Sequence, residues 1–276
     1  MMARLLGALC VAAIATVVML TGSLGARVDR QGAQLTELTI NSGAVGRRLP
    51  VSVVVPGGSG GPRRRPLLIF LHGRGGNQRS FLNGAMFAAL ARLGVRAPIV
   101  AFPYGGDHSY WHDRTDGAWG RYVMTEVIPR VVRRFKANGS RIAIGGVSMG
   151  GFGAYDLARL HPARFCAVGG HSPALWQSSG QTAPGAFDNS RDFARHDVIA
   201  AARASPARFT RQPVWLDAGR ADPFRAGDHA FVAALRADHA GLIARTWPGG
   251  HNGAYWNSHW SSYLGFYADA LARCKR

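Results

Sequence analysis

The chain has 276 residues, of which 47% are hydrophobic and 17% charged, so it can build a sizeable core and wholesale disorder is excluded. Its 33 Lys+Arg against 15 Asp+Glu give a net charge of +18, which could suit an anionic partner such as nucleic acid, acidic lipid or cell-wall polymer. The arginines are scattered and no RNA-reading or helix-turn-helix signature accompanies them, so we expect no nucleic-acid partner.

The amino terminus predicts export. A short positive start at Met1–Arg4 precedes the almost wholly apolar run Leu5–Leu20. The small residues Ser23–Gly25 form an acceptable cleavage site, which favours a signal peptide over residues 1–25 and a secreted or cell-envelope-associated product. The alternative is an uncleaved membrane anchor, because the uncharged span Leu5–Ala26 is long enough to cross a bilayer.

Residues 26–276 predict a single α/β domain. Apolar runs predict strands near Gln34–Ile40, Arg48–Val55, Pro66–Leu71, Ala97–Phe102, Arg141–Gly146, Phe165–Gly170, Gln212–Ala218 and Leu242–Trp247. Helical periodicity lies near Gly84–Leu93, Tyr122–Phe135, Met149–His161, His229–His239 and Trp260–Arg273. This alternation predicts a mostly parallel central sheet with helices on both faces. The first strands have no helix between them, so we expect an antiparallel amino-terminal edge, with Pro56–Pro62 as a hairpin loop.

One connection is unusually long. About 40 residues separate the strand ending near His171 from the strand that follows Arg211. Loops of this length usually have a function of their own. We therefore expect residues 172–211 to be a cap segment over the active site, with a short helix near Asp197–Ala204.

The most specific motif is Gly146-Val147-Ser148-Met149-Gly150. A β-branched, apolar strand runs directly into it and a helical pattern follows it. This is the context of a G-x-S-x-G nucleophile elbow, in which the serine sits on a strained turn between strand and helix. The motif predicts Ser148 as a nucleophile.

A serine hydroxyl is a poor nucleophile without a base, and in this fold the acid and the histidine follow the serine along the chain. Asp222 and His251 each lie in a loop that follows a predicted parallel strand, at the sheet edge where Ser148 lies. Asp217 competes for the acid role, but it lies within or at the end of its strand, where pleating fixes its direction. We expect Asp222 to be the acid, His251 the base and Asp217 a structural carboxylate.

Two backbone N–H groups are needed to stabilise an oxyanion. Met149 follows the nucleophile and should supply one donor, and Arg74, in the glycine-rich loop after the third strand, should supply the other. The Arg74 side chain could also contact an anionic substrate.

The remaining cysteines and histidines leave some alternatives open. Cys166 and Cys274 could form a disulfide in an exported protein, or remain two unpaired thiols. His108 and His112 have a metal-like spacing but no evident third ligand, so we expect no metal site. The proposed chemistry requires no other cofactor.

Five segments together resemble the putative-esterase family of α/β-hydrolases. They are LHGRGG at Leu71–Gly76, GDHSYWHD at Gly106–Asp113, GVSMGG at Gly146–Gly151, LDAGRADPF at Leu216–Phe224 and GGHNGAYW at Gly249–Trp256. That family includes S-formylglutathione hydrolase (esterase D) and the mycolyltransferases, and the resemblance spans roughly Arg48 to Arg273. It implies the same roles for Ser148, Asp222, His251, Arg74 and Met149. The export segment is a departure, because S-formylglutathione hydrolases are typically cytosolic.

The resemblance also implies an aromatic pocket. Tyr110, Trp111 and Trp119 match a stretch that lies near the acyl pocket in relatives, and Trp176 lies in the predicted cap. We expect Tyr110, Trp111 and Trp176 to contact the substrate; ordinary core packing is the alternative.

The sequence therefore predicts an exported serine esterase that acts on a small-molecule, lipid or polysaccharide ester. The alternatives are a mycolyltransferase-like acyltransferase with the same triad and a non-catalytic, basic cell-envelope binding protein. The sequence also allows association with the membrane or the cell envelope, and it does not predict an oligomeric state.

Overall fold

The computed structural model describes residues 28–58, 64–236 and 241–275. The predicted export segment, residues 1–25, lies outside these ranges. Across the described ranges, none of the helices combines the length and hydropathy needed to span a bilayer.

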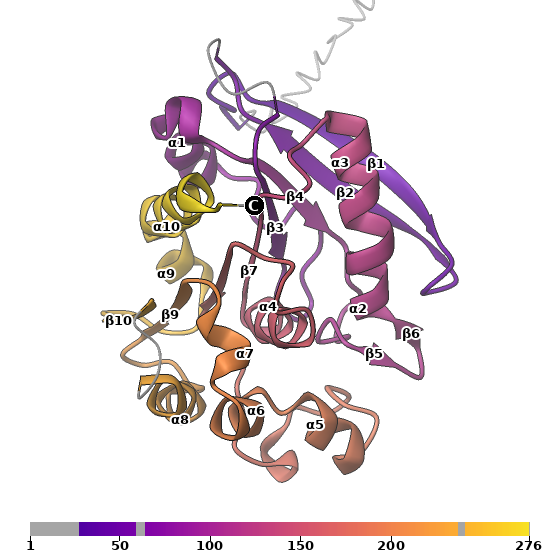
Figure 1. The fold of residues 1–276 in the computed structure, drawn as a ribbon, viewed down its shortest axis with the longest axis vertical. Coiled ribbons are helices and arrows are strands. Elements are labelled where there is room, and N and C mark those ends of the chain that lie inside the picture. Colours follow the sequence, from indigo (N-terminus) through magenta and orange to yellow (C-terminus); the bar gives the residue numbers. More distant parts are fainter. Residues whose placement is uncertain (1–27, 59–63, 237–240, 276) are drawn as a thin grey trace, which may run out of the picture.

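An eight-stranded sheet forms the centre of the molecule (Figure 1). Its strands, in spatial order, are β1 (Gln34–Ser42), β2 (Arg47–Val55), β4 (Ile99–Pro103), β3 (Leu67–Leu71), β7 (Ile142–Val147), β8 (Ala167–His171), β9 (Val214–Gly219) and β10 (Leu242–Trp247). The pairs β1–β2 and β2–β4 are antiparallel, and every pair from β4 to β10 is parallel. This arrangement confirms the predicted fold class, including the antiparallel amino-terminal edge.

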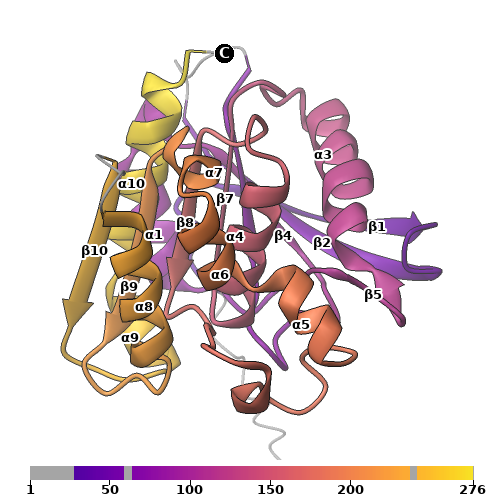
Figure 2. The ribbon, with the colours of Figure 1, turned by 60° about the horizontal axis from the view of Figure 1, so that its bottom comes forward.

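Helices cover both faces of the sheet (Figure 2). One face carries α1 (Gly84–Arg92), α9 (Gly253–Ser258) and α10 (Trp260–Arg273), and the other carries α3 (Ile128–Phe135), α4 (Met149–Leu160), α6 (Val198–Ala204) and α8 (Arg225–Arg236). Strand β3 is apolar throughout because both of its faces are buried. Leu67, Ile69 and Leu71 pack into the core on one side of the sheet, and Leu68 and Phe70 pack into the core on the other side.

Shorter elements complete the described fold. They are the hairpin β5 (Asp113–Arg114) and β6 (Gly117–Ala118), the turns η1 (Gly94–Arg96) and η3 (Ser179–Gln181), and the helices α2 (Trp119–Arg121), η2 (Tyr122–Val127), α5 (Ser190–His196) and α7 (Ala207–Thr210).

One predicted connection was wrong. The segment from Pro56 does not close a hairpin, because β2 pairs with β1 and β4, and β4 separates it from β3. The antiparallel hairpin joins β1 to β2 instead, through a turn that ends at Gly46, whose φ of 70° suits glycine. The predicted helix near His229 also begins earlier, at Arg225.

The segment predicted to be a cap, residues 172–211, contains η3, α5, α6 and α7. Helices α6 and α7 pack against α4, and α6 also packs against α8 (Figure 2). Asp197 caps the start of α6 by accepting a hydrogen bond from the Ala200 N–H. The role of residues 172–211 as a cover of the active site stays a prediction.

Cys166 and Cys274 form a disulfide, with their Cα atoms 5.7 Å apart. The bond ties the residue just before β8 to the end of the last helix, α10. Of the two alternatives that the sequence left open, the structure has the bonded one.

Candidate active site

Ser148 lies at a sharp turn between β7 and α4. Its backbone has a φ of 55° and a ψ of −117°, a conformation that L-residues rarely adopt. The flanking glycines are required by close packing, since a Cβ on Gly150 would lie 2.1 Å from the carbonyl oxygen of Leu71, and a Cβ on Gly146 would lie 2.5 Å from the Gly150 backbone. The turn therefore lifts the Ser148 hydroxyl above the carboxyl edge of the sheet.

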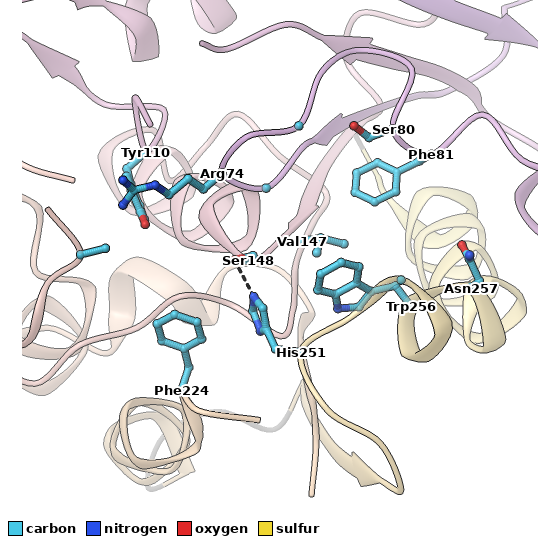
Figure 3. A pocket seen from close by; sticks show the side chains of 14 residues that line it. Arg74, Ser80, Phe81, Tyr110, Val147, Ser148, Phe224, His251, Trp256 and Asn257 are labelled. Carbon is cyan, nitrogen blue, oxygen red and sulfur yellow. Dashed lines mark hydrogen bonds between the residues drawn. The ribbon is translucent and has the colours of Figure 1, made fainter. Parts of the chain in front are cut away.

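Three side chains form a hydrogen-bonded chain at this edge. The Ser148 Oγ lies 2.8 Å from Nε2 of His251 (Figure 3). Nδ1 of His251 lies 3.0 Å from Oδ2 of Asp222. The Asp222 carboxylate favours the proton on Nδ1, which leaves Nε2 to accept the serine hydroxyl. The three residues follow β7, β9 and β10, so the sheet brings together residues that are up to 103 positions apart in the chain.

The Asp222 carboxyl is suited to stay ionised beside the imidazole. Burial alone would raise its pKa, but hydrogen bonds from His251 and from the Phe224 N–H outweigh that effect and lower the pKa below its usual value.

Asp217 lies on β9 and points elsewhere. Its carboxylate accepts hydrogen bonds from Trp215 Nε1 (2.7 Å), Tyr255 Oη (2.8 Å) and Tyr263 Oη (2.9 Å), and it lies 2.7 Å from Nδ1 of His171. Burial, followed by the charge of Asp217, raises the pKa of both tyrosines, so both phenols remain donors. The structure thus brings Asp222 to His251 and places Asp217, as a structural carboxylate, in a buried network of side chains.

The two expected oxyanion donors flank Ser148. Met149 is the first residue of α4, where a backbone N–H has no partner within the helix. Arg74 lines the cavity above the serine, and the backbone of Gly73 packs on Ser148 so closely that a Cβ there would lie 3.3 Å from the serine Cβ.

His72 holds this loop, a role that sequence reasoning missed. Its Nδ1 donates to the Gly73 carbonyl (2.8 Å) and its Nε2 accepts from the Gly105 N–H (2.9 Å). Burial lowers the pKa of His72 to about 4, so the ring is neutral at physiological pH and can fill both roles. Its position directly between β3 and the glycine-rich loop was the available signal.

A cavity of about 470 Å³ opens above Ser148. Figure 3 shows two sides to it, with Arg74, Tyr110 and Phe224 on one side of the Ser148–His251 pair and Phe81 and Trp256 on the other. Both Phe224 and Trp256 contact the His251 ring, with ring centroids 5.0 and 5.2 Å away. The reacting atoms therefore lie between two largely aromatic walls, each of which can hold one half of a substrate.

Of the three aromatic residues expected to contact substrate, Tyr110 lines this cavity and the other two do not. Trp111 is fully buried beneath the glycine-rich loop, where its Nε1 donates to the carbonyl of His72 (3.1 Å). Trp176 packs behind the wall, with ring centroids 5.2 Å from Tyr110 and 5.7 Å from Phe224. Phe81, Phe224 and Trp256 line the cavity in their place, and sequence reasoning missed them, although Phe224 and Trp256 follow Asp222 and His251 closely in the chain.

This arrangement can perform nucleophilic chemistry on a carbonyl group. The imidazole can accept the serine proton during attack, the carboxylate can stabilise the resulting imidazolium, and nearby N–H groups can stabilise negative charge on the carbonyl oxygen.

Comparisons with known proteins agree with this chemistry. A family model described as "Putative esterase" matches residues 42–267. The MPT51 antigen of Mycobacterium leprae is 30% identical over 179 residues, which are 62% of this chain and 56% of that protein, so the match spans little more than half of that relative. Among solved structures, a ferulic acid esterase has a TM-score of 0.75 at 20% identity, covering 87% of this chain and 98% of that chain. An S-formylglutathione hydrolase from Agrobacterium tumefaciens has a TM-score of 0.72 at 20% identity, covering 87% and 96%. These structures share the α/β-hydrolase fold with the chain.

Proposed function

Because the chain belongs to the "Putative esterase" family of α/β-hydrolases, we propose that it is an exported serine esterase with Ser148 as nucleophile, His251 as base and Asp222 as acid. The single observation that carries the proposal is the continuous chain of hydrogen bonds from the serine hydroxyl through the imidazole to the carboxylate.

The proposed reaction forms and breaks an acyl-enzyme. His251 Nε2 takes the hydroxyl proton as Ser148 Oγ attacks the ester carbonyl, and the N–H groups of Met149 and Arg74 stabilise the oxyanion. The imidazolium then gives its proton to the departing alcohol. Water attacks the acyl-enzyme with His251 again as base, which releases the acid and restores the serine.

A fluorophosphonate probe tests the nucleophile. We expect it to label the folded wild type at Ser148, with labelling lost in Ser148→Ala and strongly reduced in His251→Gln. Peptide mapping of the labelled site checks this, and a folded wild type that stays unlabelled would contradict the proposal.

Acyl transfer to an alcohol is the second candidate. The cavity has walls on both sides of the serine, so an acceptor hydroxyl could occupy the side left by the first alcohol. Product analysis with a sugar such as trehalose present distinguishes the two reactions, because exclusive release of free acid would remove transfer.

Export is supported by the Cys166–Cys274 disulfide, since such bonds persist in oxidising compartments. We propose a small-molecule, lipid or polysaccharide ester as the substrate, encountered outside the cytoplasm or at the cell envelope. The intact mass of the exported protein tests cleavage, since a mass that retains residues 1–25 would instead support an anchor.

A further inference from the structure

A second cluster of polar side chains takes no part in the chemistry above. His112, from the loop before β5, meets Asp192 and His196, which lie one turn apart on α5. One ligand atom from each residue lies within 4.8 Å of the others. The side chains of His112 and Asp192 are fully buried, and that of His196 is 12% exposed. His112 thus meets two residues of a helix that begins about 80 residues further along the chain, and His108, with which it was paired in the sequence, is not part of this cluster.

The spacing of these atoms suits a metal ion. His112 Nε2 lies 3.1 Å from Asp192 Oδ2, and His196 Nε2 lies 3.8 Å from Asp192 Oδ1. Zinc bound tetrahedrally at about 2.0 Å holds its ligand atoms about 3.3 Å apart. The first separation is close to that value, whereas one ligand atom from each of the three residues lies within 4.8 Å of the others, so the side chains have to draw closer together around an ion.

Neighbouring residues orient the cluster as they do around bound metals. Asp156 on α4 lies 2.7 Å from Nδ1 of His196, which places a proton on Nδ1 and turns the Nε2 lone pair toward Asp192. Arg159 in turn holds Asp156, with its Nε donating over 2.8 Å. Figure 2 shows α5 lying near α4, the helix that supplies both residues.

His112 is anchored on one side only. Its Nδ1 is buried and has no hydrogen-bond partner among the described residues, whereas Nε2 faces the cluster. The one polar anchor of this ring therefore lies at the place where a metal would bind.

The buried charge also favours a cation. Asp156 and Asp192 are both fully buried, whereas of the two guanidinium groups that pair with them Arg159 is 8% exposed and Arg195 is 57% exposed. Arg195 contacts Asp192 Oδ1 over 2.8 Å from the solvent side, so of these four charged groups the two carboxylates are the most completely removed from solvent. A cavity of about 290 Å³, lined by His112, Asp156 and His196, gives an ion access.

We propose that His112, Asp192 and His196 bind one divalent transition-metal ion of the zinc type, with a fourth position open to water. Two imidazole nitrogens and a carboxylate oxygen are donors that zinc prefers. The ion joins α5 to the loop that carries Tyr110, two residues before His112, so it stabilises one wall of the active-site cavity and does not act on the substrate.

Metal analysis tests the site directly. Untagged, exported protein is stripped with EDTA, dialysed against low-micromolar zinc chloride and measured by inductively coupled plasma mass spectrometry. We expect about one zinc ion per wild-type chain, and at least a tenfold loss in His196→Gln and in Asp192→Asn. His161→Gln is the matched control, because His161 lines the same cavity outside the donor set. His251→Gln excludes binding at the active site, and both controls should retain the zinc.

Two further readouts are independent of catalysis. Zinc should raise the melting temperature of the wild type by several degrees but leave that of His196→Gln unchanged, and cobalt should give the visible absorption of a four-coordinate site only in the wild type. Circular dichroism establishes that the variants are folded. A folded wild type that retains less than a tenth of an equivalent of zinc overturns the proposal, and so does unchanged retention in folded His196→Gln.

Discussion

Two histidine–aspartate pairs lie close together in this protein, and their surroundings give them different roles. His251 lies 3.0 Å from Asp222 and His171 lies 2.7 Å from Asp217. The second ring nitrogen of His251 faces the Ser148 hydroxyl in an open cavity, whereas that of His171 lies 3.0 Å from the Tyr267 hydroxyl in the core. The pair itself is therefore not the signature of a catalytic site; what decides is the group that the far nitrogen meets and whether substrate can reach it.

The buried pair supports the open one. The His171 carbonyl accepts the N–H of Ser148 over 3.0 Å, and Tyr255, on the helix that follows the His251 loop, donates to Asp217. The Asp217 network thus joins the strand beside the nucleophile to the helix beside the base. We expect substitutions in the open pair to change the reaction rate and those in the buried pair to change stability.

The largest expected effect is on the open pair. Asp222→Asn should lower kcat by about 10⁴-fold with little change in melting temperature, because an amide no longer holds the imidazole in the tautomer that accepts the serine proton. Steady-state hydrolysis of p-nitrophenyl esters measures kcat, and thermal unfolding measures stability. A variant that keeps more than a tenth of the wild-type kcat would remove Asp222 from the proposed mechanism.

The second effect is on the buried pair. Asp217→Asn leaves several buried donors without a charged acceptor, so the free energy of unfolding should fall by about 3–5 kcal/mol. Urea denaturation measures this loss. If Asp217→Asn were as stable as the wild type but lost activity as completely as Asp222→Asn, the buried pair would not have the structural role assigned to it.

The sequence predicted the open pair better than the buried one. Ser148, Asp222 and His251 lie in loops that directly follow parallel strands, so strand order alone placed them at one edge. Continuous apolar runs likewise placed the main strands to within a few residues. The partners of Asp217 come instead from β8, α9 and α10. No local sequence pattern indicates which tyrosine hydroxyls meet at the Asp217 carboxylate.

The cavity walls were not predictable for a related reason. Tyr110 and Trp111 both have positive φ values, 50° and 62°, so the simple alternation that assigns neighbouring side chains to faces does not apply. The position of β4 between β2 and β3 and the meeting of α5 with His112 likewise depend on long-range packing.

His72 extends the comparison to a histidine without a carboxylate partner. Its pKa in the folded protein is about 4 instead of 6.5 because it is buried. Between these values the unfolded chain binds a proton and the folded protein does not. The free energy of unfolding is therefore not reduced by His72 above pH 6.5. As the pH drops toward 4, protonation of His72 in the unfolded chain lowers the free energy of unfolding by up to about 3 kcal/mol.

His72→Gln should therefore flatten the dependence of the unfolding free energy on pH between 6.5 and 4. Urea denaturation at a series of pH values checks this, with His229→Gln, on the exposed surface of α8, as the control that should leave the slope unchanged. An identical slope in wild type and His72→Gln would show that this ring is not held neutral by its burial.

The smallest expected effect concerns the aromatic rings beside His251. These rings are the clearest difference between the surroundings of His251 and those of His171. The rings around His171, such as Phe70 and Tyr263, close it into the core, whereas Phe224 and Trp256 leave His251 facing the cavity. Each of these two should therefore contribute contact with substrate rather than support for the fold. Replacement by leucine removes the flat ring but keeps an apolar surface, so we expect about 1–2 kcal/mol of lost transition-state binding, or roughly tenfold in kcat/KM.

Because the two rings stand on opposite sides of the serine, Phe224→Leu and Trp256→Leu should change preference for different halves of the ester. Hydrolysis measured across esters that vary only in acyl length, and then only in alcohol size, separates the two sides. A uniform loss in both series would mean that the rings act together through His251, and the cavity would then have one specificity surface instead of two.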